Sequence, residues 1–174
     1  MLGRAPIVDF DGTLARLDVD WDALRRSLSL RSLDDLWGRV DTEVDGWIDD
    51  PGWRAVTAAE VEAARDAEPV AAVVSALAGC AGFAVLTANA EAAVGAFLDL
   101  RPELSARCLA VAGRETLRGS KRDPVAFARG FRRCADATAA ARAGATPVYV
   151  GDLPWELVAA RRMGAVAFDV SEVP

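Results

Sequence analysis

Carboxylates and a hydroxyl group follow directly after short apolar runs at several widely separated positions of this chain. Asp9 and Asp11 follow the first such run, Thr87 follows the second, and Asp152 follows a later one. Carboxylate, carbonyl and water oxygens are the ligands that Mg²⁺ takes in proteins. A carboxylate can also act as a nucleophile, and the ammonium group of Lys121 can neutralise a phosphoryl group. The set predicts an oxygen-only Mg²⁺ site suited to phosphoryl chemistry, provided that the fold brings these residues together.

Histidine is absent from the 174 residues, and this absence excludes whole classes of chemistry. Ser-His-Asp catalysis, Cys-His catalysis and His-ligated metals cannot occur, so acid–base catalysis must fall to carboxylates, Lys121, cysteines or Tyr149. Of the 20 basic residues only Lys121 is a lysine, which suggests a position that needs a compact ammonium rather than a planar guanidinium. The three cysteines, Cys80, Cys108 and Cys134, form no CxxC pair. We therefore expect them to be reduced packing residues.

The composition predicts a folded protein with an acidic surface. Hydrophobic residues make up 52% of the chain, which is enough for a core. The net charge of −6 argues against a nucleic-acid partner, because nucleic-acid binders carry a basic surface. No signal peptide is evident, and the longest uncharged stretch is broken by turn residues. We expect a cytoplasmic protein without a membrane partner.

Short apolar runs alternate with helical patterns over most of the chain. Strands are expected at residues 5–10, 83–86, 108–112, 147–150 and 165–170. Helices are expected at residues 69–78 and 154–164. Two more are expected, one that begins after Asn89 as its N-cap and one that begins at residue 123. This alternation implies right-handed crossovers and a parallel sheet covered by helices on both faces. The predicted fold class is therefore a three-layer, Rossmann-like α/β core. In such a sheet, ligands bind outside the carboxyl ends of the strands, where the polar residues above would meet.

Residues 16–68 are predicted to be a small α-helical cap insertion, which divides the chain into a core of residues 1–15 and 69–174 and this cap. Apolar residues at three- and four-residue spacing predict a helix over residues 33–48, and residues 20–30 predict another. Residues 50–52 have the composition of a turn, and the capping-box pattern at 57–60 predicts the start of a further helix. No strand is evident in this segment. Its four tryptophans are expected mainly in the core of the cap.

Four motifs occur in order along the chain. They are Asp9-Phe10-Asp11-Gly12-Thr13-Leu14, Leu86-Thr87-Ala88-Asn89, Lys121 with Pro124 soon after, and Gly151-Asp152-Leu153-Pro154-Trp155-Glu156. With these motifs the chain resembles the haloacid dehalogenase-like superfamily of aspartyl-nucleophile phosphatases. The resemblance covers most of the chain outside the cap insertion, and the first motif is the most specific because six adjacent residues agree. Glu156 stands where the family commonly has a second Asp.

The resemblance implies a role for each acidic residue. Asp9 would attack phosphorus and form an aspartyl-phosphate, which splits hydrolysis into two easier steps. Asp11 would protonate the leaving oxygen and then activate water, a role that needs a raised pKa. Mg²⁺ would be held by the carboxylates of Asp9 and Asp152 and by the backbone carbonyl of Asp11. Glu156 would support this site, and the sequence leaves open whether it contacts the metal directly or through water.

The resemblance also implies how a phosphorylated ligand would be bound. The Thr87 hydroxyl and the backbone N–H groups at the start of the Asn89 helix would bind phosphoryl oxygens. Lys121 would balance the charge of nucleophile and phosphoryl group. Gly12, Asn89 and Arg16 are the expected substrate-binding residues, Arg16 because it lies just beyond the first motif. A short cap and an acidic surface favour a small phosphorylated metabolite as the substrate.

The expected function is Mg²⁺-dependent hydrolysis of a phosphomonoester, and several alternatives stay open. A phosphotransferase or mutase would use the same residues and pass the phosphoryl group to a sugar. A dehalogenase is less expected, because that reaction needs neither the acid at Asp11 nor, in the family, a metal. A phospho-accepting receiver domain would carry its acceptor Asp after the third strand, and Asp9 follows the first. A binding module without turnover is the remaining possibility, and the sequence does not indicate an oligomeric state.

Overall fold

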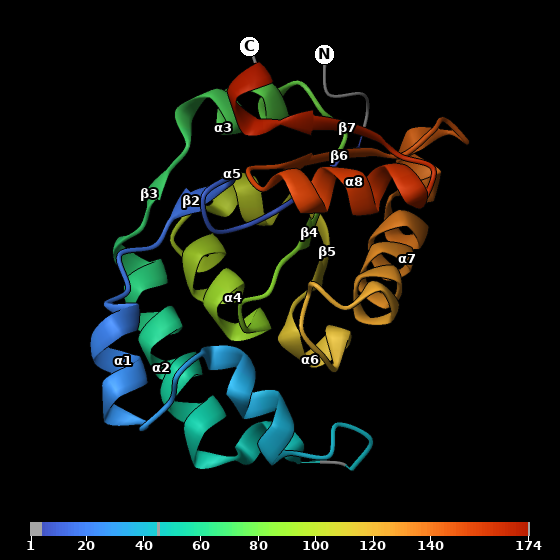
Figure 1. Ribbon diagram of the computed structural model, residues 1–174. Coiled ribbons are helices and arrows are strands. Elements are labelled where there is room, and N and C mark those ends of the chain that lie inside the picture. The colour runs from blue at the N-terminus through green and yellow to red at the C-terminus, as the bar shows by residue number, and fades with distance from the viewer. Residues whose placement is uncertain (1–4, 45, 174) are drawn as a thin grey trace.

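A five-stranded parallel sheet forms the centre of the computed structural model, which describes residues 5–44 and 46–173 (Figure 1). The strands are β1 (Ile7–Val8), β4 (Phe83–Leu86), β5 (Cys108–Ala112), β6 (Val148–Gly151) and β7 (Val166–Asp169). Their order is β5-β4-β1-β6-β7, and every neighbouring pair is parallel. Because β1 is central, the residues after it emerge at the middle of the carboxyl edge of the sheet.

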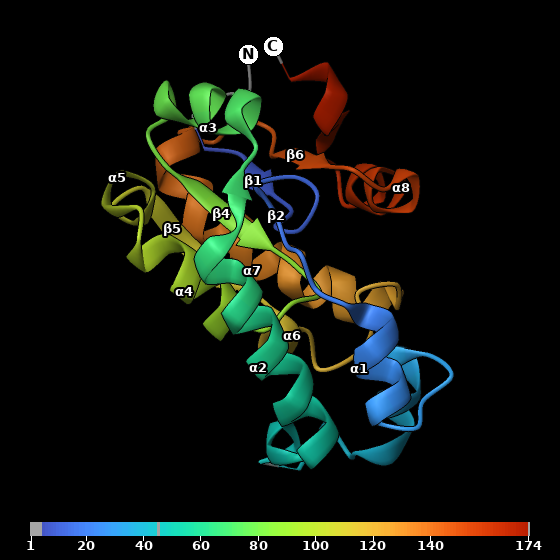
Figure 2. The same cartoon turned by 90° about the vertical axis from the view of Figure 1, so that its left-hand side faces the viewer.

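Helices cover both faces of the sheet. The helices are α3 (Ala71–Ala78), α4 (Glu91–Asp99) and α5 (Pro102–Ser105) on one face, and α6 (Arg114–Leu117), α7 (Pro124–Arg142) and α8 (Pro154–Arg162) on the other. Figure 1 shows α4 and α7 on opposite sides of β4 and β5, and in Figure 2, turned by 90°, α7 lies behind these strands. Successive strand residues point to opposite faces, so Val8 lies in one buried cluster and Ile7 in the other. The three-layer, Rossmann-like α/β architecture is confirmed.

The segment between β2 (Ala15–Arg16) and β3 (Glu68–Pro69) is helical. It contains α1 (Trp21–Ser27), the 3₁₀ helices η1 (Leu33–Arg39) and η2 (Trp47–Asp49), and α2 (Pro51–Asp66); a last 3₁₀ helix, η3 (Val170–Glu172), ends the core. Strands β2 and β3 pair antiparallel, with Arg16 opposite Glu68, so the chain leaves and re-enters the core side by side. We call residues 16–68 the cap segment; its division from the core as a separate domain stays a prediction.

The cap segment differs from the sequence-based expectation in four respects. The helix expected over residues 33–48 is wrong: Val40 has an extended backbone and Gly46 has φ +84°, so only the two 3₁₀ helices form. The turn expected at residues 50–52 is also wrong, because the Asp50 side chain caps α2 and Pro51 is its first residue. The capping box at Thr57 and Glu60 therefore lies inside α2 rather than at a helix start. The short strands β2 and β3 at the two ends of the segment were not anticipated.

Two strands of the core match the expected ranges, and some helical details do not. Strands β4 and β5 occupy the predicted residues 83–86 and 108–112. Asn89 is not the N-cap of α4; Ala90 holds that position, and the Asn89 amide is directed toward the cap segment. The short helices α5 and α6 were not anticipated, because each spans only four residues and shows no periodicity.

Two further expectations concern the state of the cysteines and the presence of a membrane-spanning helix. None of the three cysteines forms a disulfide within the described residues, as expected of packing residues. Burial raises the pKa of the Cys108 thiol to about 11 and that of Cys134 to about 12, so both thiols stay protonated at neutral pH. Across residues 5–44 and 46–173, no helix combines the length and apolar character that crossing a bilayer requires.

Candidate active site

A chain of buried polar groups begins at Asp9, directly after the central strand. The Lys121 ammonium donates hydrogen bonds to Asp9 Oδ1 at 2.6 Å and to Glu156 Oε1 at 2.9 Å. The Tyr149 hydroxyl donates to the other Glu156 oxygen, Oε2, at 2.8 Å. Burial alone would lower the pKa of Lys121, but the two carboxylates outweigh burial and raise it, so Lys121 stays charged. Glu156 thus fixes the only ammonium side chain of the protein against Asp9.

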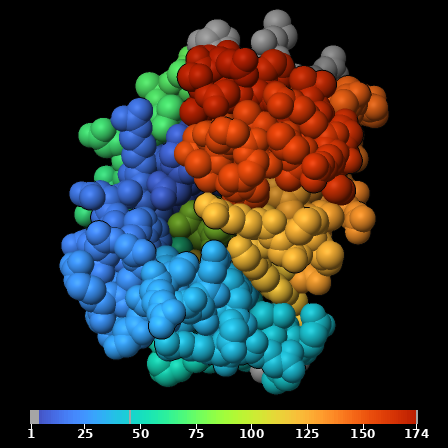
Figure 3. All heavy atoms as spheres, in the orientation of Figure 1, coloured from blue at the N-terminus to red at the C-terminus, as the bar shows by residue number. Residues whose placement is uncertain are grey.

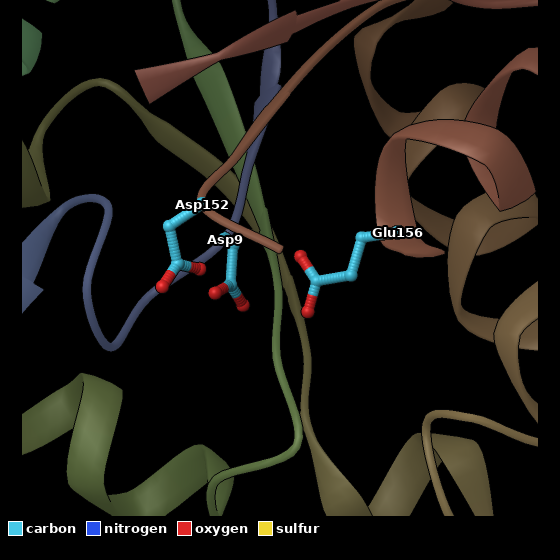
Figure 4. Close-up of side chains that lie close together, drawn as sticks. All are labelled: Asp9, Asp152 and Glu156. Atoms are coloured by element: carbon cyan, nitrogen blue, oxygen red, sulfur yellow. The ribbon is translucent and has the colours of Figure 1, made fainter. Parts of the chain in front are cut away.

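Two carboxylates from neighbouring strand ends, Asp9 after β1 and Asp152 after β6, converge at this edge with a third, Glu156, from α8. Single oxygens of Asp9, Asp152 and Glu156 all lie within 4.8 Å of one another, and Figure 4 shows Asp9 between the other two. Burial raises the pKa of Asp152, and repulsion from Asp9 adds to the increase. Burial and Asp9 likewise raise the pKa of Glu156 to about 7, while Lys121 opposes the shift. This concentration of negative charge favours a bound cation.

The donor set and one unpartnered atom indicate which of these carboxylates could hold a metal. Asp152 Oδ1 is buried without a hydrogen-bond partner in the described part of the chain, a costly arrangement that a cation would relieve. Both Glu156 oxygens are already occupied, by Lys121 and Tyr149. Within this cluster Asp9 and Asp152 therefore fit an Mg²⁺ ion best, and Glu156 fits the role of a support for Lys121. The Asp11 carbonyl as a third ligand stays a prediction from the resemblance.

Magnesium should raise the melting temperature of this protein, because an ion held only by the folded state stabilises it by mass action. The increase should be lost in Asp152→Asn, which keeps the size of the side chain and removes its charge. Thermal unfolding followed by circular dichroism, with and without millimolar Mg²⁺, measures the increase in wild type and its loss in Asp152→Asn. Glu156→Gln serves as the comparison, and we expect it to keep the Mg²⁺-induced increase; equal loss in both variants would contradict our choice of ligands.

Asp11 lies beside Asp9 in the turn that follows β1. Its Oδ1 accepts the backbone N–H of Leu17 at 3.0 Å, which anchors the carboxyl group at the start of the cap segment. Burial raises the pKa of Asp11; the Leu17 N–H opposes the increase, whereas Asp9 and Asp152 add to it. The carboxyl group is therefore easier to protonate than an ordinary aspartate, as the general-acid role requires.

Gly12 is the residue that lets this turn approach Asp152. Its φ is +83°, and a Cβ at this position would lie 2.5 Å from Asp152 Oδ2. A side chain here would meet both backbone strain and a clash with the Asp152 carboxylate.

Gly12→Ala should both destabilise the protein, by about 1–2 kcal/mol of backbone strain, and weaken Mg²⁺ binding. Gly144 provides a matched control, because its φ is +78° and nothing lies within 4 Å of a Cβ placed there. Gly144→Ala should therefore show the strain alone and keep the full Mg²⁺-induced rise in melting temperature. A full rise in Gly12→Ala as well would show that Gly12 does not shape the metal site.

The second motif is tied to the cap segment by a network that the sequence did not reveal. Thr87 Oγ1 donates to Asn89 Oδ1 at 2.8 Å, and the Asn89 amide donates to Glu60 Oε1 at 3.1 Å. Glu60 Oε2 accepts the backbone N–H of Ala90 at 2.9 Å, so a cap carboxylate occupies the N-terminus of α4. Arg114 Nη2 forms an ion pair with Glu60 Oε1 at 2.5 Å. Glu60 had matched a capping-box pattern, and no pattern marked Arg114.

The Asp9 carboxylate opens into a cavity of about 330 Å³ between the sheet and the cap segment. Its polar lining includes Asp9, Asp11, Thr87, Asn89, Lys121 and Glu156, with Glu60 and Arg114 from the network above. Figure 3 shows the molecule hollowed between the blue cap segment and the yellow residues near Lys121, with green atoms of the core visible inside. Most of the residues expected to act together therefore do line one cavity. Gly12 and Asp152 are not among the residues that line this cavity, although Asp152 lies near Asp9 and Gly12 lies against Asp152.

Arg16 is the expected substrate-binding residue that the structure places in a different cavity. It is exposed on β2 and lines a separate surface cavity together with Asp18 and Glu62. The antiparallel pairing of β2 with β3 places Arg16 opposite Glu68, which lines the same surface cavity. Arg16 therefore does not belong to the candidate active site.

Comparison with known proteins identifies the fold. No family model matches the chain, and no curated protein matches it. Solved structures do match: L-2-haloacid dehalogenase from Xanthobacter autotrophicus has a TM-score of 0.56 at 18% identity, over 95% of this chain and 76% of that one. A haloacid dehalogenase-like phosphatase from Thermococcus onnurineus has a TM-score of 0.53 at 18% identity, over 94% and 84%.

A hydrolase from Streptococcus pneumoniae TIGR4 matches as well, with a TM-score of 0.52 at 14% identity, over 97% of this chain and 92% of that one. The chain therefore has the haloacid dehalogenase-like hydrolase fold, as the motif resemblance implied. The matched structures include both dehalogenases and phosphatases, so the choice of reaction must come from the residues of the site.

Proposed function

We propose that this protein is a Mg²⁺-dependent phosphatase that hydrolyses a small phosphomonoester through an aspartyl-phosphate on Asp9. One observation carries the proposal: Asp9 faces a cavity with Lys121 bound to its Oδ1, while a second acid of raised pKa, Asp11, stands beside it. This pair supplies a nucleophile and a proton donor at one place. When bound by Asp9 and Asp152, Mg²⁺ supplies positive charge that offsets the repulsion between a carboxylate and a phosphate dianion.

Asp9 forms the new bond in the first half of the reaction. Lys121 binds Oδ1, and no hydrogen bond from the described residues reaches Oδ2, so we assign the attack on phosphorus to Oδ2. Oδ1 would then be the Asp9 oxygen that holds Mg²⁺. The bond from phosphorus to the leaving oxygen breaks as the bond to Oδ2 forms. Lys121 lies close enough to Asp9 to neutralise charge on the transferring group, and Glu156 holds Lys121 in place.

Asp11 moves the proton in both halves of the reaction. It donates its proton to the leaving oxygen, so the alcohol departs neutral, and the resulting carboxylate then removes a proton from water as that water attacks the aspartyl-phosphate. The second attack breaks the bond between phosphorus and Asp9 and releases inorganic phosphate. Anchoring by the Leu17 N–H keeps Asp11 at the mouth of the site throughout.

Asp11→Asn should lower kcat by about 10²–10⁴-fold for an alkyl phosphate, which is the usual contribution of general acid catalysis. Asparagine keeps the oxygen that accepts the Leu17 N–H, so the turn should persist. With p-nitrophenyl phosphate the loss in the first step should be smaller, because p-nitrophenolate leaves without a proton. Pre-steady-state measurement of alcohol and phosphate release from both substrates checks this, and equal losses in the first step would argue against Asp11 as the acid.

The same fold supports dehalogenation, and the site argues against that reaction here. Chloride is a weak base that leaves without a proton, so Asp11 would have no role. The carboxylates of Asp9, Asp152 and Glu156 would also repel a haloacid carboxylate in the absence of a cation. Transfer of the phosphoryl group to a second alcohol would use the residues of hydrolysis unchanged, and product analysis separates the two.

The experiment that tests the proposal measures inorganic phosphate released from p-nitrophenyl phosphate and from a panel of phosphorylated metabolites, with Mg²⁺ and after chelation. Metal-dependent release supports the phosphatase. Chloride release from 2-chloropropionate without phosphate release would establish a dehalogenase instead. Absence of both activities, together with no binding of BeF₃⁻ in place of the phosphoryl group, would establish a module without turnover.

A further inference from the structure

Tryptophan side chains are concentrated around the cavity in front of Asp9. Four of the five tryptophans of the chain, Trp21, Trp37, Trp53 and Trp155, are among its lining residues. We propose that the substrate is a phosphate monoester whose alcohol carries a neutral, flat aromatic group, bound between these indoles. The proposal rests on the phosphatase function and specifies its substrate class.

The tryptophans come from both sides of the cavity. Trp21 lies on α1, and Trp37 and Trp53 lie on η1 and α2, all in the cap segment. Trp155 lies on α8 of the core, one residue before Glu156. The cavity is therefore bounded by indole rings from the cap segment and from the core, with Asp9 and Lys121 also in its wall. Trp21, Trp37 and Trp155 are half-buried and present flat apolar surface to a ligand, whereas Trp53 is only 3% exposed.

The volume fits one phosphoryl group with one or two rings. An apolar cavity of about 150 Å³ is sufficient for benzene, and this cavity measures about 330 Å³. Only the phosphorylated end of a larger molecule would fit a space of this size.

The charges in the wall indicate that the bound group is neutral. Outside the catalytic set, the wall carries the ion pair of Glu60 with Arg114 and one further charge of each sign, Asp34 and Arg122, so these charges sum to zero. The Arg114 guanidinium also lies 4.5 Å from the centre of the Trp53 ring, and that of Arg122 lies 5.8 Å from the Trp155 ring. Protein cations therefore already face these two rings, where a cationic ligand such as a quaternary ammonium would otherwise bind.

Trp21 is the tryptophan best suited to a test, and Trp47 is its control. Trp37 and Trp53 pack against each other with ring centres 4.5 Å apart, so they also hold the cap segment together. Trp21 is half-buried and lines the cavity. Trp47 packs against Trp37 and Trp53 and does not appear in the cavity wall. The pair separates ligand contact from the general effect of removing an indole from the cap segment.

The first arm of the test measures turnover of four alkyl phosphates with similar leaving groups: 2-phenylethyl phosphate, 2-cyclohexylethyl phosphate, glycerol 3-phosphate and phosphocholine. We expect kcat/KM to be at least about tenfold higher for 2-phenylethyl phosphate than for the other three. Trp21→Ala should raise KM for it about tenfold with little change in kcat, and Trp47→Ala should not raise KM. Equal or higher efficiency with the other esters, or no effect of Trp21→Ala, would overturn the proposal.

The second arm measures binding without turnover, by titration calorimetry with 2-phenylethylphosphonate, which cannot be hydrolysed. Wild type should bind it, Trp21→Ala should bind it about tenfold more weakly, and Trp47→Ala should bind it like wild type. If no ester releases phosphate but this order of affinities holds, the phosphatase function fails and the aromatic preference of the cavity stands. If phosphate is released but the three proteins bind the phosphonate equally, the aromatic preference fails and the phosphatase function stands.

Discussion

Asp9→Asn should abolish phosphate release, with a fall in kcat of about 10⁴-fold or more. The loss exceeds that expected for Asp11, because the amide is a poor nucleophile and the covalent route disappears, whereas loss of general acid catalysis costs about 10²–10⁴-fold. Binding of BeF₃⁻ should disappear in the same variant, because the acceptor carboxylate is gone. Stopped-time phosphate assays and BeF₃⁻-induced thermal stabilisation measure the two effects.

The fold should survive Asp9→Asn, which makes the result interpretable. Asparagine retains an oxygen that can accept the Lys121 hydrogen bond, and Lys121 keeps its ion pair with Glu156 at 2.9 Å. The backbone N–H of Asp9 still donates to the Val150 carbonyl. Asp18→Asn, at an exposed position outside the cavity, is the matched control and should retain full activity. Substantial turnover by Asp9→Asn would rule out Asp9 as the nucleophile.

Glu60→Ala should destabilise the protein by about 3–5 kcal/mol, because removing one partner of a buried ion pair leaves the other charge unpaired. Glu60 is 2% exposed and Arg114 is 3% exposed, so the ion pair is shielded from bulk water. The variant also removes the acceptor for the Asn89 amide and the Ala90 N–H. Urea unfolding at constant pH measures the change in the free energy of unfolding.

A double-mutant cycle with Arg114→Ala shows whether the destabilisation by Glu60→Ala comes from the lost ion pair or only from lost packing. The double variant should be less destabilised than the sum of the two single variants, because neither buried charge is then left alone. Glu62→Ala, at an exposed position of the same helix, should change stability by less than about 0.5 kcal/mol. Additive losses in the cycle would show that Glu60 and Arg114 do not depend on each other.

The predictions for Asp9 and for Glu60 differ in how far the sequence alone could lead to them. Asp9 and Lys121 are separated by 112 positions, yet both could be placed at one sheet edge. Asp9 follows a strand directly, and Lys121 lies in the connection between a strand and the next long helix of a parallel α/β sheet. Composition supported the assignment of Lys121 to the site, because Lys121 is the only lysine of the chain and histidine is absent. Local patterns, namely short apolar runs and the motif that follows the first of them, were therefore sufficient to predict the core strands and the position of the candidate nucleophile.

The cap segment was predicted less well, because backbone conformation at single residues breaks the expected helix and because α2 begins earlier than its capping-box pattern indicates. The apolar spacing over residues 33–48 suits a helix, but Gly46 adopts a left-handed backbone and Val40 is extended, so the tryptophans pack through two 3₁₀ helices. Thr57 and Glu60 have the spacing of a helix start, yet Asp50 and Pro51 begin the helix earlier. Sequence pattern identifies the apolar residues and does not decide which backbone conformation buries them.

By itself the sequence determined the α/β core, the carboxylates at its edge and the kind of chemistry they suit, because strand period and motif spacing are local properties. Only the tertiary structure decided the partners of these residues. It placed Glu156 on Lys121 and Tyr149, directed Asn89 to a cap carboxylate, and took Arg16 away from the cavity. Those contacts depend on how elements from distant parts of the chain pack together, and no spacing within one element encodes that geometry.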